Sequence, residues 1–474
     1  MYLGLDLGTS GLKGLLVDED QSVVREASAP LKVRRPHDAW SEQDPDDWIE
    51  ACRQVCAALG DLSAVRAVGL SGQQHGATIL GADHAPLRPC MLWNDTRAHA
   101  EATAFDDDAT RAVIGSISFP GFTAPKVEWV RRNEPEVFEA ARLILLPKDY
   151  LRLWLTGEAF SDMSDASGTG WLDVAARDWS DDLLARSGLG RENMPALAEG
   201  SSPAGAISDA AAAATGLPAR IPVAGGGGDN AASAVGVGVV EPGIAFASLG
   251  TSGVLFAATG RFDPKPETAV NEFAHALPDL WHQMGVILAA TDALEWLSKV
   301  LGRGAAELTG GLGPLQAPGR TAFLPYLGGE RTPHNDAALR GAFAGLGHAS
   351  DAEALTRAVL EGVVFAFADN KIALEATGTR IERLVGVGGG TRSDYWLAAL
   401  ATALDVPVEL PVSGDFGGAF GAARLAMMAD GAGRDIATVP PIARTVHPDP
   451  ALRDAFAAGH DRHRDLADRM KGLA

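Results

Sequence analysis

Apolar residues alternate with small or polar residues on both sides of one five-residue sequence, and this arrangement occurs twice in the chain. Leu-Gly-Thr-Ser-Gly occupies positions 7–11 and again positions 249–253. Because successive side chains of a strand point to opposite faces, alternation around a Gly/Ser turn predicts a β-hairpin. The sequence therefore predicts two similar hairpins, over 2–17 and over 244–257, with one in each half of the chain.

The turns of both hairpins consist of small residues, which let backbone N–H groups approach an anion closely. Two such hairpins indicate a duplicated architecture that holds a polyphosphate from both sides. One position breaks the symmetry, since Asp6 aligns with Ser248. A carboxylate beside a phosphate repels it unless a cation lies between them, so Asp6 is predicted to lie on the Mg²⁺ side of the site.

A second pair of similar segments follows the hairpins in the same order. Positions 66–72 and 383–389 both read as a short apolar strand that runs into glycine. The two then diverge, because 73–76 is polar and hydrogen-bonding, whereas 390–393 is small and exposes its backbone. We therefore expect one half to bind a polyhydroxy substrate and the other to bind the base and ribose of a nucleotide.

Strands alternate with helices along the chain, which predicts an α/β protein with helices layered against its sheets. The proline–glycine pair at 242–243 marks the clearest break between apolar segments. It separates a predicted N-terminal domain over 1–240 from a C-terminal domain over 243–430, and a helical tail over 431–474 follows. Helices are expected over 45–59, 292–301, 351–376, 454–471 and from near Gly418, and strands over 221–224 and 382–387.

Composition and charge narrow the class of protein. With 474 residues, of which 46% are hydrophobic, the chain is long enough for two or three folded domains. No apolar run approaches the roughly 20 residues of a membrane-spanning helix. A strand is expected from Tyr2, which leaves no room for a secretory signal, and Cys52, Cys56 and Cys90 cannot all pair. These features predict a cytoplasmic protein with free thiols and no membrane association.

The formal net charge of −21 argues against nucleic-acid binding through the surface field. A polyanionic ligand must therefore be held locally by backbone amides, Mg²⁺ and a few cations. Neither Gly-x-x-x-x-Gly-Lys-Ser/Thr nor Gly-x-Gly-x-x-Gly occurs in the chain. Their absence removes the P-loop nucleotidases and weakens the case for a dinucleotide-dependent dehydrogenase.

Asp229 is the sharpest single candidate for chemistry. It follows four glycines at 225–228, between the strand expected over 221–224 and a helix that begins in the alanines at 231–232. A simpler interpretation is that Asp229 caps this helix. A cap does not need four glycines to clear space around it, however. A sugar hydroxyl is barely ionised at neutral pH, so a carboxylate that accepts its proton suits attack on phosphorus.

Several weaker candidates each have a simpler alternative. Gln74 and His75 are either sugar ligands or ordinary polar loop residues. Positions 93–97, Trp-Asn-Asp-Thr-Arg, have the composition of a sugar site, but the pattern is weakly specific. Lys13 is close enough to the first hairpin to contact a phosphate, although a solvated lysine is more common. The Glu-Arg pair at 330–331 also fits an exposed ion pair in a turn.

Taken together, these residues resemble the FGGY carbohydrate kinases, which have the actin/hexokinase/Hsp70-like ATPase fold. The resemblance implies an α/β protein of two duplicated ribonuclease-H-like domains, with sugar bound mainly to the first, nucleotide to the second, and the active site between them. It covers nearly the whole chain. Besides the hairpins, the matching segments are 40–45, 72–76, 92–95, 120–126, 146–150, 161–168, 228–230, 330–333 and 388–390.

The resemblance also assigns roles to individual residues. It makes Asp229 the general base and Asp6 the residue near Mg²⁺, which it holds through water. The sugar-binding positions are Gln74, His75, Trp93, Asn230 and Asp229 itself. The positions expected to bind ATP are Thr9, Ser10, Lys13, Gly250 and Thr251 on the phosphate side, and Gly388, Gly389 and Ser393 around the adenosine.

The implied reaction is transfer of a phosphoryl group from ATP to the terminal hydroxyl of D-xylulose, by a cytoplasmic enzyme that can form a homodimer. Gln74 departs from the pattern, because bacterial relatives with that activity often carry methionine there, and a polar side chain changes hydrogen bonding to the sugar. Kinases of another pentulose, a deoxy sugar or a polyol remain alternatives. A nucleotide-switched interaction protein is a more remote one, because such proteins share the paired hairpins.

Overall fold

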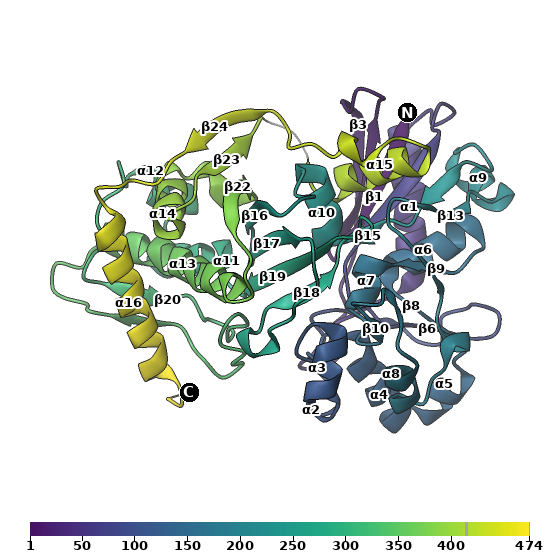
Figure 1. Ribbon diagram of the computed structural model, residues 1–474, viewed down its shortest axis with the longest axis horizontal. Helices are drawn as coiled ribbons and strands as arrows, with labels where there is room; N and C mark the ends of the chain where they lie inside the picture. The colour runs from purple at the N-terminus through teal and green to yellow at the C-terminus, as the bar shows by residue number, and fades with distance from the viewer. Residues whose placement is uncertain (413–415, 474) are drawn as a thin grey trace.

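A computed structural model describes residues 1–412 and 416–473, and two large sheets, one from each half of the chain, dominate it (Figure 1). The first sheet contains, in spatial order, β13 (Pro203–Ala206), β14 (Pro222–Ala224), β5 (Ala67–Gly72), β1 (Tyr2–Leu7), β2 (Gly11–Val17) and β3 (Val23–Pro30), and β15 (Gly227–Gly228) also pairs with β5. The second contains β18 (Asn271–Ala274), β19 (Trp281–Ile287), β17 (Gly253–Thr259), β16 (Gly243–Leu249), β22 (Ile381–Val387), β23 (Val408–Pro411) and β24 (Ile442–Val446).

Both expected hairpins are present, and they occupy equivalent places in the two sheets. β1 pairs antiparallel with β2 and parallel with β5, and β16 pairs antiparallel with β17 and parallel with β22. The register places Asp6 opposite Lys13 in one hairpin and Ser248 opposite Val254 in the other. The repeats therefore build the same three-strand arrangement in each half.

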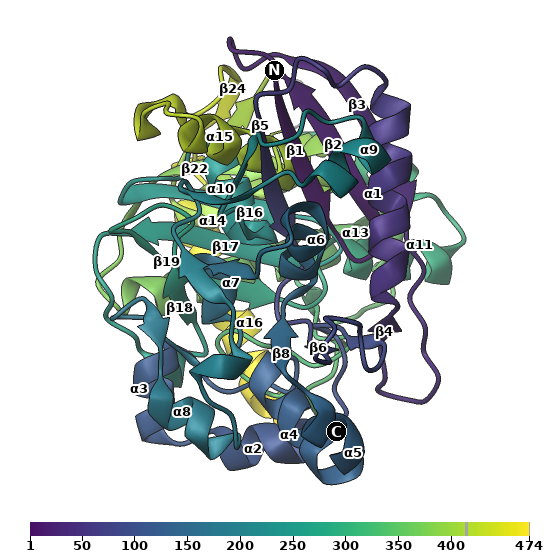
Figure 2. The ribbon, with the colours of Figure 1, turned by 90° about the vertical axis from the view of Figure 1, so that its right-hand side faces the viewer.

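The expected helices are also confirmed, with ends that differ by at most one residue. They are α1 (Pro45–Leu59), α11 (Thr291–Leu301), α13 (Ala352–Glu375), α15 (Gly418–Ala429) and α16 (Arg453–Met470). The side chain of Asp44 caps α1, and Trp48, Cys52, Val55 and Cys56 lie on its buried face. This face packs on the first sheet, as Figure 2 shows. All three cysteines are buried and unpaired.

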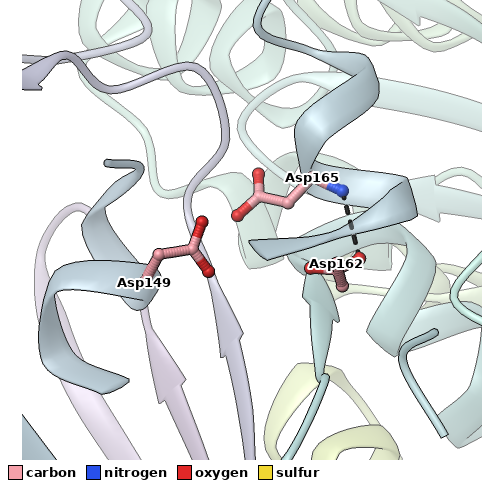
Figure 3. A group of neighbouring side chains, drawn as sticks. All are labelled: Asp149, Asp162 and Asp165. Atoms are coloured by element: carbon pink, nitrogen blue, oxygen red, sulfur yellow. Dashed lines mark hydrogen bonds between the residues drawn. The ribbon is translucent and has the colours of Figure 1, made fainter. Parts of the chain in front are cut away.

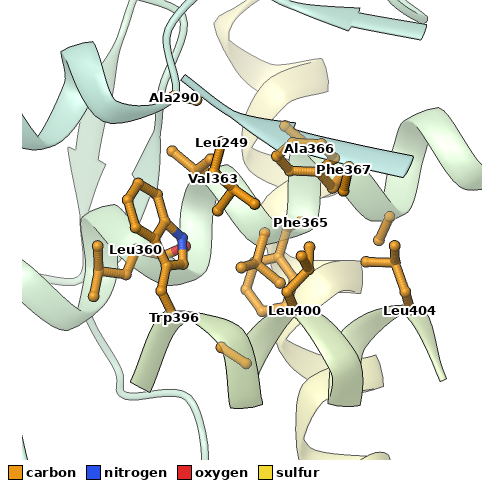
Figure 4. Packing of buried hydrophobic residues seen from close by; sticks show 14 of the residues in the cluster. Leu249, Ala290, Leu360, Val363, Phe365, Ala366, Phe367, Trp396, Leu400 and Leu404 are labelled. Atoms are coloured by element: carbon orange, nitrogen blue, oxygen red, sulfur yellow. The ribbon is translucent and has the colours of Figure 1, made fainter. Parts of the chain in front are cut away.

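The largest apolar core lies in the second half, where α13 packs on the second sheet and on α14 (Asp394–Leu404). Figure 4 shows Trp396 and Leu400 of α14 next to Leu360 and Val363 of α13, with Leu249 of β16 close by. The indole nitrogen of Trp396 donates to the carbonyl oxygen of Leu360 at 3.1 Å, so its only polar atom is satisfied in this apolar setting. The core thus supports the end of the second hairpin.

Two central helices, α15 and α10, pack against elements from the other half of the chain. α15 comes from the second half but packs on β1 and β5 of the first sheet. Gly4 and Gly69 permit this, because a Cβ on either would lie 1.9 or 1.8 Å from a carbonyl oxygen of α15. α10 (Asp229–Val237), from the first half, packs on α15 and contributes Ala234 and Val237 to an apolar cluster with Phe246 of β16. These helices therefore join the two halves.

The remaining elements form smaller sheets and the other helices, of which α7 is wholly buried. In the first half they are β4 (Glu42–Gln43), β6 (Thr78–Leu80), β7 (Cys90–Met91), α2 (His99–Phe105), α3 (Asp108–Ile114), α4 (Thr123–Asn133), α5 (Pro135–Ala140), β8 (Leu143–Leu145), α6 (Pro147–Thr156), β9 (Phe160–Asp162), α7 (Met163–Ser167), β10 (Leu172–Asp173), β11 (Asp178–Trp179), α8 (Asp181–Arg186), η1 (Arg191–Asn193), β12 (Ala196–Ala198) and α9 (Asp209–Thr215). In the second half they are η2 (Pro266–Thr268), α12 (Ala305–Gly310), β20 (Ala322–Leu324), β21 (Ala342–Ala344), η3 (Gly389–Arg392) and η4 (Arg434–Ile436). No helix among the described residues has the length and apolar character needed to cross a membrane.

Candidate active site

Asp229 is the first residue of α10 and follows the four-glycine turn at 225–228. Gly226 has a φ of +77°, and a Cβ there would lie 2.2 Å from a carbonyl oxygen of β5, so the turn requires glycine. The helix is capped by Gly228, not by Asp229. The Asp229 carboxylate accepts hydrogen bonds from the backbone N–H of Asn230 at 2.7 Å and from its side-chain Nδ2 at 2.9 Å. The interpretation of Asp229 as a simple cap is therefore wrong.

Burial and the negative charge of Asp6 raise the pKa of the Asp229 carboxyl to about 7. The hydrogen bonds from Asn230 act in the opposite direction, because they stabilise the carboxylate. A carboxyl with this pKa exchanges its proton near neutral pH, as a general base must. The influence of Asp6 also means that the two carboxylates predicted for the site lie close enough to interact.

Three segments converge on the Asp6 carboxylate near the end of β1. The hydroxyl of Ser71, from β5, donates to Asp6 Oδ1 at 2.7 Å. Lys13, from β2, lies opposite Asp6 in the hairpin register. A Cβ on Gly418, the first residue of α15, would lie 2.9 Å from the Asp6 carboxyl, so the positive end of this helix approaches the carboxylate closely.

One ring nitrogen of His75 is hydrogen-bonded within the protein, and the other remains an acceptor. Its Nδ1 donates to the carbonyl oxygen of Gly168 at 2.7 Å, and the ring stacks on Phe122 with centroids 4.7 Å apart. Burial lowers the pKa of His75 to about 3, so the imidazole is neutral. Because Nδ1 carries the proton, Nε2 keeps a lone pair that can accept a hydrogen bond from a sugar hydroxyl.

Gln74 and Asn230 both lie next to the turn that carries Asp229. A Cβ on Gly228 would lie 2.6 Å from Gln74 Nε2, which shows how closely the glutamine side chain packs on this turn. Gln74 Nε2 also donates to the carbonyl oxygen of Ser164 at 3.4 Å. Asn230 contacts Asp229 and also lines a cavity next to the second sheet. Both are therefore neighbours of the candidate base.

Thr9 and Trp93 contact each other rather than standing free. Trp93 Nε1 donates to Thr9 Oγ1 at 2.9 Å, and Thr9 Oγ1 donates to Gln73 Oε1 at 3.0 Å. The Thr9 hydroxyl thus makes both of these hydrogen bonds within the protein. Trp93 is 44% exposed and remains a candidate aromatic surface for a sugar. Thr9 ties the first hairpin turn to the polar loop.

Asp95 and Arg97, from the same segment as Trp93, have a structural role. Arg97 pairs with Asp95 at 2.6 Å and with Glu42 at 2.7 Å, and its guanidinium lies 3.3 Å from the centre of the Trp40 ring. Asp95 also accepts from the backbone N–H of Ser41. These interactions fix the loop from which Trp93 projects.

The two hairpin turns are anchored differently on the phosphate side. In the first, Ser10 is exposed, and Lys13 Nζ lies 3.3 Å from Glu26 on the partly exposed edge of the sheet. In the second, the carbonyl oxygens of Gly250 and Thr251 accept backbone N–H groups from the start of α11. The side chain of Thr251 is exposed.

A cavity of about 790 Å³ lies between α10 and the second sheet. Ser248, the counterpart of Asp6, lines it together with Gly388 and Thr391, whose Oγ1 donates to the Gly388 carbonyl oxygen at 2.7 Å. The sequence did not single out Thr391. Gly389 follows as the first residue of η3, whereas the side chain of Ser393 caps α14, and neither is among the described residues that line the cavity. A cavity of this size accommodates a nucleotide.

The Glu-Arg pair at 330–331 is not an exposed ion pair. Glu330 is 2% exposed and accepts backbone N–H groups from Leu288 and Arg331, and burial raises the pKa of its carboxyl to about 8. The Arg331 guanidinium lies 4.0 Å from the centre of the Phe119 ring, and burial lowers its pKa to about 10. This pair therefore joins a loop of the second half to the first.

Sequence reasoning missed one buried charge cluster below the polar loop. Lys148 Nζ lies 2.6 Å from Asp149, 2.7 Å from Asp162 and 2.9 Å from Asp165, and all four side chains are fully buried. Figure 3 shows the three carboxyl groups, which come from α6, the end of β9 and α7. The available signal was the presence of charged residues at 148–149 and 162–165 within otherwise buried segments.

A carboxyl that titrates near neutral pH, a second carboxylate beside it and a nucleotide-sized cavity together define the class of phosphoryl-transfer enzymes. Comparison with known proteins specifies the family. Residues 1–236 match the N-terminal domain and residues 245–429 match the C-terminal domain of the FGGY family of carbohydrate kinases. The chain belongs to this family, and the predicted two-domain fold is confirmed. The membership favours a kinase over a nucleotide-switched interaction protein.

Particular relatives narrow the comparison further. The chain is 49% identical over 438 residues to the xylulose kinase of Escherichia coli (strain K12), and the match covers 90% of each chain. It superimposes on the crystal structure of a "xyloylose kinase" from Brucella ovis with a TM-score of 0.98, 57% identity and 100% of both chains covered. The xylulose kinase of Rhodospirillum rubrum is similar with a TM-score of 0.92, 30% identity and 99% of both chains covered.

Proposed function

We propose that this protein transfers the γ-phosphoryl group of ATP to the terminal hydroxyl of D-xylulose and forms D-xylulose 5-phosphate. The observation that carries the proposal is the Asp229 carboxyl, whose pKa is raised to about 7 beside Asp6. It stands in a chain that is 49% identical over 438 residues to a xylulose kinase. The similarity supports the choice of sugar, and the carboxyl supports the direct transfer.

In this proposal Asp229 is the general base. The terminal hydroxyl of the sugar donates to its carboxylate, and the proton moves to Asp229 late, as the new O–P bond forms through a loose, in-line transition state. No phosphoenzyme is required. Gln74, His75, Asn230 and Trp93 hold the sugar, and the neutral His75 contributes Nε2 as a hydrogen-bond acceptor. Closure of the two halves would exclude water and so suppress hydrolysis of ATP.

ATP is proposed to occupy the cavity next to the second sheet. Because the net charge of the chain is −21, an anionic ligand must be held locally, and backbone N–H groups of the cavity suit this task. Gly388 lines the cavity. The remaining positions proposed to contact ATP are Gly389 and Ser393 at the adenosine and Thr9, Ser10, Lys13, Gly250 and Thr251 at the phosphates.

The residues present fit a divalent cation. Asp6 provides a hard oxygen donor, and its charge raises the pKa of Asp229, so a cation bound beside the two carboxyl groups would reduce their mutual repulsion. Mg²⁺ bound near Asp6, through water, would neutralise charge on the phosphate oxygens. Asp6 would then hold the cation while Asp229 accepts the proton.

The test is ADP formation from ATP and Mg²⁺ by the purified protein, with and without D-xylulose. We expect strong stimulation by D-xylulose, well above that by D-ribulose, a deoxy sugar or glycerol. Stimulation by a different acceptor would overturn the choice of sugar while keeping the kinase reaction, and it would direct attention to Gln74. Slow hydrolysis that no sugar stimulates would overturn the proposed function.

The proposal also extends to domain roles and cellular setting. Residues 1–240 would bind the sugar and 243–430 the nucleotide. The tail over 431–474 is helical only in part, because besides α16 it contributes β24 to the second sheet, and it ends outside the described residues. We expect a cytoplasmic enzyme that forms a homodimer. Light scattering during size-exclusion chromatography would test the dimer, since a monomeric mass at micromolar concentration contradicts it.

A further inference from the structure

The buried cluster around Lys148 has the composition of a metal site but is already neutralised by protein. Oxygen atoms of Asp149, Asp162 and Asp165 lie close enough together to ligate one ion. The Lys148 ammonium, however, lies 2.6 to 2.9 Å from one oxygen of each carboxyl. A cation in the middle of the three carboxyls is therefore supplied by the chain itself, which points to a structural or positioning role.

The charges of the cluster balance when one carboxyl carries a proton. Lys148 and Arg152 bring two positive charges to three carboxyl groups. Burial raises the pKa of Asp149, and it raises the pKa of Asp165 well above that of an ordinary aspartate. A protonated Asp165 leaves two carboxylates against two cations. A balanced cluster of this kind is costly to disrupt, because each remaining charge would be unpaired in the interior.

Ser164 connects this cluster to both sides of the candidate site. Its hydroxyl donates to Asp162 Oδ1 at 2.5 Å and accepts from the backbone N–H of Gly228, the residue before Asp229, at 3.1 Å. Its carbonyl oxygen accepts from Gln74 Nε2 at 3.4 Å. One fully buried serine thus contacts the turn that presents the base and the side chain expected to bind the sugar.

Arg152 holds the same turn from its other end. Its guanidinium donates to the carbonyl oxygens of Ala224 and Gly225, each at 2.6 Å, and to that of Ala204 at 3.3 Å. The whole side chain is buried. The four-glycine turn is therefore fixed at its start by Arg152 and at its end by Ser164. Such support matters here, because glycine gives the backbone little conformational preference of its own.

We propose that Ser164 is a positioning residue for phosphoryl transfer, and that Lys148 and Asp162 hold it in place. Through Gly228 it sets the position of the Asp229 carboxylate, and through its carbonyl oxygen it sets Gln74, so that base and sugar are aligned by one residue of α7. The inference rests on the proposed function, since it assigns the alignment of the base that this function requires. It predicts that Ser164 affects the rate of transfer more than the stability of the fold.

The chain offers a matched control for this proposal. Ser161 is also a buried serine in the cluster, and its hydroxyl donates to Asp149 Oδ2 at 2.7 Å, but it has no described contact with the glycine turn. Ser164→Ala and Ser161→Ala each remove one hydroxyl that donates to a buried aspartate. A purely structural role predicts that any loss of kcat follows the loss of Tm, whereas positioning predicts a loss of kcat in Ser164→Ala that its Tm does not explain.

The experiment compares kcat, KM for ATP, Tm and amide hydrogen exchange in the two variants. Because a displacement of about 1 Å at a reacting group can cost about 100-fold in rate, we expect Ser164→Ala to lower sugar-dependent kcat at least about tenfold. Its KM for ATP should equal that of Ser161→Ala, which should keep a kcat near the wild-type value, and the Tm of both variants should stay well above the assay temperature. Exchange in the peptide that contains Gly228 should rise only in Ser164→Ala.

Two results would overturn the positioning role. One is an equal kcat for the two variants, and the other is faster exchange at Gly228 in both or in neither. Hydrogen exchange needs no sugar, so it reports on the turn even if the proposed reaction is wrong. Failure of the proposed function appears separately, as wild-type protein whose ADP formation no sugar stimulates.

Discussion

The two hairpins share a pentapeptide, a strand arrangement and a place in their sheets, yet they are embedded in different surroundings. The first turn is tied by side chains, through Thr9 to Gln73 and Trp93, in addition to a backbone hydrogen bond from Leu31 to the Ser10 carbonyl oxygen. The second is tied by backbone carbonyls of Gly250 and Thr251 to the start of α11. Side-chain contacts connect the first turn to the polar loop, whereas the Thr251 side chain of the second turn is exposed and has no described hydrogen bond.

The difference is sharpest one residue before each pentapeptide. Asp6 influences the pKa of Asp229, whereas Ser248 lines the cavity on the nucleotide side. The same hairpin backbone can therefore serve two purposes, because the side chain at this one position either adds a negative charge or leaves room for a ligand. The comparison predicts which substitutions affect transfer and which affect nucleotide binding.

Asp229→Ala should have the largest effect, since it removes the proposed general base, which only the first half of the molecule carries. General-base catalysis contributes about 100- to 10,000-fold, and we expect a loss of kcat in that range with little change in ATP binding. A coupled ADP assay measures the rate, and calorimetry measures ATP affinity. Asp209→Ala is a suitable control, because Asp209 is also the first residue of a helix, α9, but is exposed. Near-normal turnover of Asp229→Ala would remove it from the mechanism.

Asp6→Ser makes the first hairpin resemble the second. We expect kcat to fall about 100-fold, because the carboxylate that holds the cation near the transferring phosphate is lost, while sugar affinity changes little. The dependence of rate on Mg²⁺ concentration should weaken in parallel. Turnover with an unchanged Mg²⁺ requirement would show that the two hairpins do not differ in the proposed way.

The comparison also indicates what the sequence makes predictable. The hairpins and the Asp229 turn were found because alternation and four successive glycines are local signals. The packing of α15 on the first sheet was not, since it depends on Gly4 and Gly69, which lie far from α15 in the chain. No local pattern marks those glycines as contact points between distant segments.

The same limit applies to side chains with several possible partners. Thr9 is proposed to contact a phosphate, but the sequence did not predict that its hydroxyl also donates to Gln73, a residue whose proximity depends on β1 pairing with β5. Lys148 was visible in the sequence only as one charged residue among many, and the three carboxyls that surround it come from separate elements. Chemistry at a single turn is readable from sequence, whereas networks assembled by tertiary packing are not.

Ser248→Asp is the reverse exchange and should affect the nucleotide. A carboxylate added to the cavity would repel the phosphates of ATP, so we expect KM for ATP to rise about tenfold, which corresponds to roughly 1.4 kcal/mol. The KM for the sugar should stay near its wild-type value. Initial rates at varied ATP and fixed sugar measure the change. A rise in sugar KM alone would place Ser248 on the wrong side of the site.

The pH dependence of the rate provides a smaller but independent test. Since Asp229 must be ionised to accept a proton and its pKa is about 7, kcat/KM for the sugar should fall as pH drops below that value. Asp6 raises this pKa, so in the residual activity of Asp6→Ser the fall should begin at lower pH. If kcat/KM falls at the same pH in Asp6→Ser as in the wild type, Asp6 does not act on the titrating group.

Replacing each turn threonine by valine should give the smallest effect and the most detailed comparison of the two turns. Thr9→Val removes a hydroxyl that accepts from Trp93 and donates to Gln73, so it should loosen the polar loop and raise the KM for the sugar. Thr251→Val removes an exposed hydroxyl and should raise the KM for ATP instead. One hydrogen bond is worth about 0.5–1.5 kcal/mol, which corresponds to roughly 2- to 12-fold in either constant. Matched KM measurements for both substrates decide the point. If both variants raise only the KM for ATP, the Thr9 hydroxyl turns toward a phosphate when nucleotide binds, and the two turns are more alike in the working enzyme than their different anchoring indicates.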